Sequence, residues 1–368
     1  MTEKIISDTY GILKHMSQPV FLVRAGKIVY RNAAAANLLE EGSAEIDRLL
    51  GENAEAYRAF DGTGAMGLCL TLGGREYGAT VYREDGADVF LASPTPLEAS
   101  MSADTLSAIS RTVRGQLTEL FDVASVLFPV LEEQENPHIQ KNTARLNRSF
   151  YRLLRIAGNL SDVTQFMNGE TGLFDERTDL NAFFGELGEK IGSYCEAVGI
   201  RFCYDCPETC FYGSIDRQKI ERAVLNLISN AMKYTPPGGT ISLRVERTER
   251  SVMIRVIDDG EGIEPATLSG VFERSENREL PGDPRWGIGL GLRIVRDIAR
   301  LHGGTVLLHS SPRKGTTAIL SFALRSQPCR TSLRSPLMNY DYAGGYSHTA
   351  VELADVLPND VFDTVNIS

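Results

Sequence analysis

Two carboxamides and one ammonium group recur on one face of a predicted helix in the run ERAVLNLISNAMKYTPPGG, residues 221–239. Asn226, Asn230 and Lys233 follow one another at steps of four and three residues, which is the spacing of neighbours on a helix face. The apolar residues of the run fall on the opposite face, which predicts a buried core there. Carboxamide oxygens suit a hard cation, and an ammonium group suits phosphate oxygens. The run therefore predicts a helix that forms one wall of a site for a cation and phosphates.

Two glycine-rich turns follow this helix and fit the same kind of site. The segment IDDGEGI, residues 257–263, comes directly after an alternating, strand-like run, so Asp258 stands where a strand ends. The segment GIGLGL, residues 287–292, opens a run with helical spacing, and glycines at a helix start let backbone amides approach a phosphate. A third turn, KGTT at residues 314–317, precedes a final strand-like run. One such turn is weak evidence, but three in this order indicate a nucleotide pocket.

These elements together resemble the catalytic ATP-binding domain of sensor histidine kinases, in the superfamily that also contains gyrase. NLISNAMKY is similar to the asparagine box of that family, and DDGEG and GIGLGL are similar to its two glycine boxes. The resemblance covers about residues 170–325 and implies an α/β sandwich that binds ATP with Mg²⁺. The ATP-binding residues that it implies are Asn226, Asn230, Lys233, Tyr234, Asp258, Gly260, Gly262, Gly287, Gly289, Leu290, Gly291 and Thr316.

The resemblance also implies individual roles. Asn230 would be the magnesium ligand, Lys233 a phosphate contact and Tyr234 a wall against the adenine, while Asp258 would accept a hydrogen bond from the adenine amine. Asn226 stands where the related ATPases resemble one another in carrying a water-activating glutamate. A carboxamide has no basic site, so we expect poor hydrolysis and favoured phosphoryl transfer to a protein. The proline-rich, weakly periodic run 264–286 predicts a mobile lid over ATP.

Composition limits the remaining possibilities. The 368 residues are enough for two or three domains, and a net charge of −10 argues against non-specific binding of nucleic acid. The longest apolar runs fall far short of the ~20 residues that a bilayer crossing needs, and the first ten residues lack a signal-peptide pattern. We therefore expect a cytoplasmic protein without a transmembrane segment.

Cysteines occur at a spacing that some metal sites use. Cys203, Cys206 and Cys210 form a C-x2-C-x3-C pattern, with Cys195 upstream, and one interpretation is a zinc or iron–sulfur site. The stronger interpretation is a set of half-buried thiols in a strand and turn that lead into the asparagine-box helix.

The first hundred residues predict a small sensor domain. Two strand signals flank the turn at residues 24–26, an alanine-rich helix follows Asn32, and three further strands fall at residues 68–72, 76–83 and 88–92. This order of elements resembles a PAS sensor domain, which we place at residues 1–100. His15 and Cys69 are expected to be structural.

A helical hairpin is predicted for residues 101–170. Apolar residues step by threes and fours from Leu106 to Leu131, Asn136 and Pro137 break the run, and a second helix follows. Two copies of such a hairpin would bury their stripes as a dimeric four-helix bundle. In position it resembles the dimerisation and phosphoacceptor domain of the same kinases, but Arg111 occupies the usual phosphoacceptor position and Thr112 that of the adjoining acid. We expect His138, at the turn, to be an exposed histidine.

Residues 171–325 are then the ATP-binding domain and residues 326–368 an acidic tail. Thr349 and Glu352 suggest a capping box that opens a short helix, and the apolar content of the tail favours docking on the body.

Two functions remain open on the sequence. The first is an ATP-dependent kinase of the histidine-kinase type that acts as a homodimer in a two-component pathway. Because of Arg111, its phosphoryl group would go elsewhere than the usual site. The second is a non-catalytic ATP-binding pseudokinase that scaffolds or regulates a partner kinase or a response regulator. The PAS-like and hairpin regions argue against a third, a serine/threonine kinase of the anti-sigma type.

Overall fold

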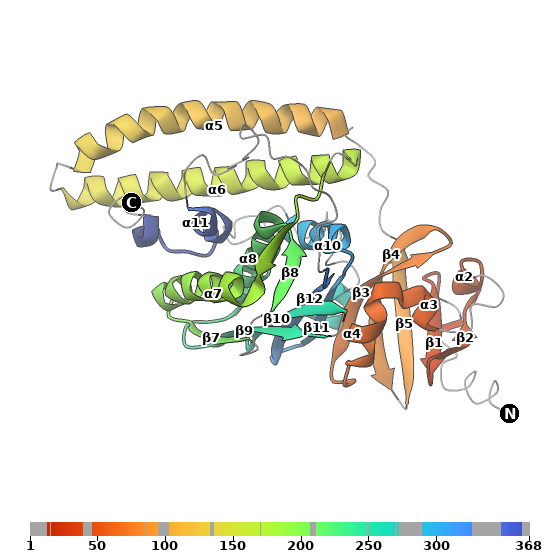
Figure 1. The fold of residues 1–368 in the computed structure, drawn as a ribbon. Coiled ribbons are helices and arrows are strands. Elements are labelled where there is room, and N and C mark those ends of the chain that lie inside the picture. The colour runs from red at the N-terminus through yellow and green to blue at the C-terminus, as the bar shows by residue number, and fades with distance from the viewer. Residues whose placement is uncertain are drawn as a thin grey trace.

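A computed structural model describes residues 13–14, 16–39, 46–84, 86–94, 103–132, 136–169, 171–206, 211–248, 250–268, 271, 289–325 and 347–362. An elongated helical hairpin lies along one side, the region of residues 171–325 lies beneath it, and the N-terminal domain flanks that region (Figure 1). Among the helices described, none combines the length and apolar character that a bilayer crossing requires.

The N-terminal domain is an antiparallel sheet of five strands in the order β2-β1-β5-β4-β3. Phe21 and Phe90 stack in its core with ring centroids 4.7 Å apart. Asn32 caps the alanine-rich helix, which ends at Ala36. The elements are β1 (Val20–Arg24), β2 (Lys27–Arg31), α2 (Ala33–Ala36), α3 (Ile46–Leu50), η2 (Gly51–Asn53), α4 (Ala54–Arg58), β3 (Ala65–Leu72), β4 (Arg75–Glu84) and β5 (Ala87–Pro94).

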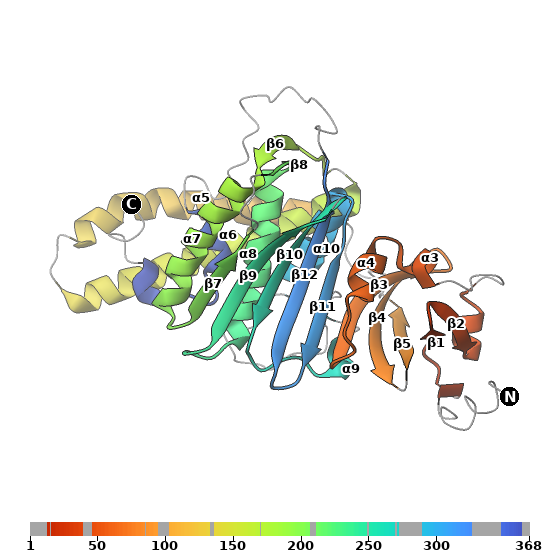
Figure 2. The same cartoon turned by 60° about the horizontal axis from the view of Figure 1, so that its bottom comes forward.

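Residues 171–325 form a two-layer α/β sandwich in which helices cover one face of a sheet (Figure 2). Its sheet contains β7 (Arg201–Asp205), β9 (Thr240–Arg247), β10 (Ser251–Asp258), β11 (Val306–Ser311) and β12 (Gly315–Ala323). The helices are α7 (Leu180–Ala197), α8 (Arg217–Tyr234), α9 (Pro265–Leu268) and α10 (Gly291–Leu301). A separate two-stranded sheet pairs β6 (Glu176–Asp179) with β8 (Tyr212–Ile215).

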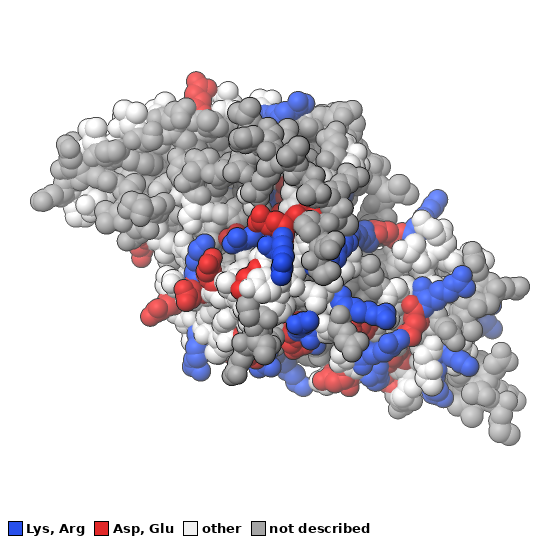
Figure 3. Space-filling model, in the orientation of Figure 1, with Lys and Arg blue, Asp and Glu red and all other residues white. Residues whose placement is uncertain are grey.

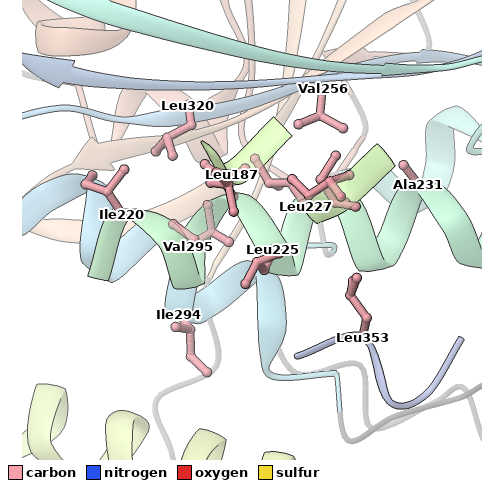
Figure 4. Close-up of a cluster of buried hydrophobic side chains, with 14 of the residues drawn as sticks. Leu187, Ile220, Leu225, Leu227, Ala231, Val256, Ile294, Val295, Leu320 and Leu353 are labelled. Carbon is pink, nitrogen blue, oxygen red and sulfur yellow. The ribbon is translucent and has the colours of Figure 1, made fainter. Parts of the chain in front are cut away.

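Helix α8 forms where the sequence predicts it because both ends and one face are specified. Asp216 caps its start by accepting a hydrogen bond from the Lys219 amide. Its apolar face, which includes Ile220 and Leu227, packs against the sheet residues Val256 and Leu320 (Figure 4). The burial of this stripe fixes which face of α8 is left for polar residues.

The two sheets join edge to edge. Strand β3 pairs antiparallel with β11 through Leu308 opposite Gly67, His309 opposite Met66 and Ser310 opposite Ala65. The result is one sheet of ten strands that runs from β2 to β7. The sequence predicts two separate domains here and contains no signal for the shared sheet.

Helices α5 (Ala103–Glu132) and α6 (Pro137–Asn168) pack side by side as the predicted hairpin. Asn136 caps α6 and Gly169 ends it in the left-handed conformation. The apolar stripe of α5 divides into two parts: Leu117 and Ala124 are buried, whereas Leu120 and Leu127 are exposed.

The described part of the tail, residues 347–362, docks on the body, as the apolar content of the tail predicts. Helix α11 (His348–Leu353) and the turn η4 (Asn359–Phe362) pack against α6, and α11 also packs against α8. The predicted capping box is wrong: Ser347 caps the helix by accepting a hydrogen bond from Ala350, and both Thr349 and Glu352 are buried. Burial of the Glu352 carboxylate is compensated because arginine side chains lie beside it.

Candidate nucleotide-binding site

Helix α8 presents Asn230 and Lys233 as half-buried side chains near its C-terminal end. The Lys233 Nζ lies 5.5 Å from the ring centroid of Tyr234, which keeps the ammonium group beside the aromatic face. A half-buried carboxamide oxygen suits a magnesium ion as a ligand. A half-buried ammonium group suits phosphate oxygens, to which it can donate hydrogen bonds.

Asp258 ends β10, which lies between β9 and β12 in the sheet. Its Oδ1 accepts hydrogen bonds from the backbone amides of Gly260, at 3.0 Å, and Thr316, at 3.2 Å. Burial raises the pKa of the Asp258 carboxyl to about 6, although these two amides oppose the shift. The carboxylate is therefore held in place through Oδ1, and Oδ2 is the oxygen that suits an amine donor.

The first glycine turn allows three backbone segments to meet closely. A Cβ at Gly260 would lie 2.5 Å from the carbonyl oxygen of Tyr234, and one at Gly262 would lie 2.1 Å from that of Ser311. Gly315 has φ +90°, and a Cβ there would lie 1.9 Å from the carbonyl oxygen of Asp258. Only glycine fits these positions. These glycines therefore bring the end of α8, β10 and β12 together around Asp258.

Ser310 is a site residue that the sequence analysis misses. Its Oγ accepts a hydrogen bond from the Ile263 amide at 2.8 Å and lies 2.9 Å from both the Gly315 carbonyl oxygen and the Thr316 Oγ1. Ser310 thereby fixes the first glycine turn to β12. A single serine in a strand is common, so the sequence contains no signal for this role.

The second glycine turn leads into α10. Gly289 has φ +74° and Leu290 precedes the first helical residue, Gly291. Gly287 and residues 269–270 and 272–286 of the predicted lid lie outside the described residues. The amides at the start of an 11-residue helix provide the positive end of a dipole, which is suited to a phosphate.

Asn226 makes contacts that its sequence position alone does not predict. It is buried, and its Nδ2 donates to the Arg222 carbonyl at 2.9 Å and to Glu352 Oε2 at 3.2 Å. Its Oδ1 accepts from Arg155 Nη2 at 3.4 Å. A Cβ at Gly291 would come within 2.8 Å of that same oxygen. In this arrangement Asn226 links α8 to α10, to the hairpin and to the tail.

The described cysteines differ in their burial and in the elements that carry them. Cys195 is buried in α7, Cys203 is exposed on β7, and Cys206 is half-buried beyond it. Within the part of the chain that the structure describes, no three histidine, cysteine or acidic side chains gather as metal ligands. Cys210 lies outside the described residues.

The part of the chain that contains this site matches a known protein family. Residues 215–326 match the family described as histidine kinase-, DNA gyrase B-, and HSP90-like ATPase. That range begins just before α8 and contains Asp258, both glycine turns and Ser310. Residues 215–326 therefore form an ATPase domain of this family.

Relatives of this histidine kinase ATPase domain are sensor proteins. The Sensor protein KdpD of Clostridium acetobutylicum is 28% identical over 207 residues, which are 56% of this chain and 23% of that protein. The Sensor protein DivL of Caulobacter vibrioides is 26% identical over 230 residues, which are 62% of this chain and 29% of that protein. A solved structure of full-length ShkA with AMPPNP is 22% identical, with a TM-score of 0.49, and covers 62% of this chain and 48% of that one. The chain thus matches less than a third of the length of these two curated relatives.

Proposed function

We propose that the protein is a dimeric, sensor histidine kinase-like component of two-component signalling that binds Mg-ATP in its ATPase domain. The observation that carries this proposal is Asp258: a buried carboxylate, fixed through Oδ1 by two backbone amides, inside a region that matches the ATPase family. Its free oxygen would accept the adenine amine and so favour ATP over GTP.

The remaining residues would contact different parts of the nucleotide. Asn230 would ligate Mg²⁺ and Lys233 would contact a phosphate, since both are half-buried near the end of α8. When bound, Mg²⁺ would offset the negative charge of the phosphates and orient them. Tyr234 would stand against the adenine, and the start of α10 would bind phosphate oxygens through backbone amides.

The other domains support a signalling role. Residues 1–100 would be a PAS-like sensor, because two strands, short helices and three antiparallel strands follow one another there. The hairpin of α5 and α6 would form the dimer. A response regulator or a partner kinase would be the protein partner, since the relatives include sensor proteins and kinases.

Phosphoryl transfer at the usual acceptor position is not supported. Arg111 is exposed on α5, and a guanidinium group has no basic nitrogen that could accept a phosphoryl group. The neighbouring Thr112 hydroxyl donates to the Ala108 carbonyl at 3.0 Å. We therefore propose that the acceptor is another residue or another protein, with a non-catalytic regulator as the alternative.

The proposal is tested by nucleotide titration of Asn230→Ala, with Gln218→Ala as the matched control. Gln218 is an exposed carboxamide on the same helix. We expect Asn230→Ala to lose at least about tenfold in Mg-dependent affinity for a fluorescent ATP analogue, which is about 1.4 kcal/mol. Affinity equal to that of the control would contradict the magnesium assignment.

A parallel incubation with γ-labelled ATP distinguishes the two functional alternatives. Acid-labile, base-stable label would mean a phosphohistidine, and acid-stable label would mean transfer to serine or threonine. Bound nucleotide without label, in the presence and absence of partner proteins, would establish the non-catalytic regulator.

A further inference from the structure

The C-terminal segment, residues 347–362, fills the space between the hairpin and the ATPase domain. Helix α11 lies between α6 and α8 in Figure 1, and Leu353 points toward α8 from the side away from the sheet in Figure 4. Val351, Leu353, Leu357 and Phe362 have no exposed surface. The Phe362 ring lies 5.1 Å from that of Tyr151 on α6. This degree of burial shows that the segment contributes to the interface between two domains.

Two carboxylates of the segment bind arginines of both domains. Glu352 is completely buried, with Oε2 at 3.6 Å from Arg155 Nε on α6 and Oε1 at 3.5 Å from Arg222 Nε on α8. Asp355 accepts from Arg152 Nε at 2.9 Å and from Arg155 Nη1 at 2.8 Å. On the face shown in Figure 3, acidic and basic side chains gather along the line where the hairpin meets the ATPase domain. The segment thus places negative charge where two elements present positive charge.

Helix α6 also recognises the backbone of the segment. Arg148 donates to the carbonyl oxygens of Ala354, at 3.2 Å, and Asp355, at 3.1 Å. Asn147 Nδ2 donates to the Phe362 carbonyl at 2.9 Å. Hydrogen bonds to backbone carbonyls fix the register of the segment, which apolar contact alone would not do.

The segment is connected to the phosphate-binding end of the site through Asn226. The Asn226 carboxamide donates to Glu352 and lies against Gly291, the first residue of α10. Glu352, Asn226 and Gly291 therefore form a continuous line of contacts from the tail to the second glycine turn. Breaking the contacts of the tail would free both the hairpin side of α8 and the start of α10 to move.

We propose that residues 347–362 are an autoinhibitory latch, which holds the ATPase domain against α6 and restrains the start of α10. Release of the latch would allow nucleotide to bind faster and the ATPase domain to reach an acceptor. Only this consequence rests on the proposed function. Its surface on α6 and α8 fits an acidic, amphipathic helical segment. A protein that offers such a segment would displace the latch.

Hydrogen exchange of the full chain tests the latch without reference to nucleotide. Arg152→Gln removes the arginine from a partly exposed ion pair with Asp355, whereas Asp355→Asn weakens the contacts of Asp355 with both Arg152 and Arg155. Both variants leave the fully buried Glu352 in place. We expect each variant to exchange the amides of residues 350–357 about fivefold faster, and the double variant to exchange no faster than Asp355→Asn alone. Glu246→Gln, which breaks the surface pair of Glu246 with Arg255, is the matched control. Exchange equal to that of the control, or fully additive effects, would overturn the latch.

Nucleotide kinetics on the same variants separate the two proposals. Faster association of a fluorescent ATP analogue with Asp355→Asn than with the control supports inhibition by the latch. If the ATP analogue associates at the control rate although hydrogen exchange is faster, residues 347–362 only hold the domains together. That result would overturn the inhibitory role. Lack of binding in every variant at any concentration would overturn the proposed nucleotide site, while the exchange result still decides whether the segment is held by these ion pairs.

Discussion

At the scale of single residues, the chemistry of the site depends on Asp258. Burial favours the neutral acid, so the folded pKa of about 6 lies above the ordinary value of 3.8. The stability that the protonated carboxyl contributes is therefore fully present below about pH 3.8 and is lost as the pH rises through about 6. Accepting the adenine amine requires the ionised form. Protein stability and nucleotide affinity thus respond to this group in opposite directions as pH changes.

We predict that affinity for ATP falls as the pH is lowered from 7.5 to 5. Well below a pKa, the ionised fraction of the group falls about tenfold per pH unit, so the loss attributable to Asp258 is up to about tenfold at pH 5. Titration with a fluorescent ATP analogue at several pH values measures this loss. The phosphates of the nucleotide also titrate, and Asp258→Asn corrects for them because only the carboxyl is absent. A profile for Asp258→Asn as steep as that of the unaltered protein would rule out the proposed role.

At the scale of elements, the hairpin leaves an apolar surface on its outer side. Leu120 and Leu127 are 51% exposed and Val126 is 70% exposed, whereas Leu117 is buried inside the chain. Exposed apolar residues at helical spacing along α5 are suited to a second copy of the same helix. Among the described side chains of the hairpin, further large exposed apolar residues are Ile109, Val123, Val130, Leu146, Leu153 and Ile156.

Replacement of Leu120 and Leu127 by glutamate is predicted to give monomers. Burying two carboxylates per chain in a helical seam costs more than the dimer gains there, while the exposed positions tolerate charge in the monomer. Sedimentation velocity measures the outcome, and Gln116→Glu on the same helix controls for added charge. A dimer that persists would place the interface on another surface.

At the scale of the whole molecule, the N-terminal domain is joined to the ATPase domain through β3 and β11. Arg300 and Arg296 of α10 pair with Glu76 of β4, and Thr305 donates to Asn53. Strand β11 also contains Ser310, which holds the first glycine turn. Strand β11 therefore contacts both the N-terminal sheet and the first glycine turn.

Glu76→Lys is expected to loosen this junction, because it places a third cation beside Arg296 and Arg300. Hydrogen exchange should become faster at residues 65–67 and 308–310, which form the β3–β11 pairs. Glu246→Lys, at the distant surface pair with Arg255, provides the control for charge reversal. Unchanged protection at residues 308–310 would show that the strand pairing, rather than these charges, holds the domains together.

The sequence by itself determined the elements and much of the nucleotide site. Helix α8 follows from the spacing of its apolar residues and from Asp216 at its start. The glycine turns follow from glycines at positions where no other residue fits. These features are local, since a few neighbouring residues specify them. For this reason the ATPase domain was recognisable before its structure was known.

The tertiary structure decided which polar residues of α8 contact other parts of the chain. Asn226 lies on the predicted face with Asn230, but its carboxamide binds Arg155 and Glu352, which are distant in sequence. The shared sheet, Ser310 and the burial of Glu352 likewise depend on contacts between segments far apart in the chain. The spacing of apolar residues along a helix or strand predicts only which side of that element is buried. The packing of the whole chain determines which partner covers that side.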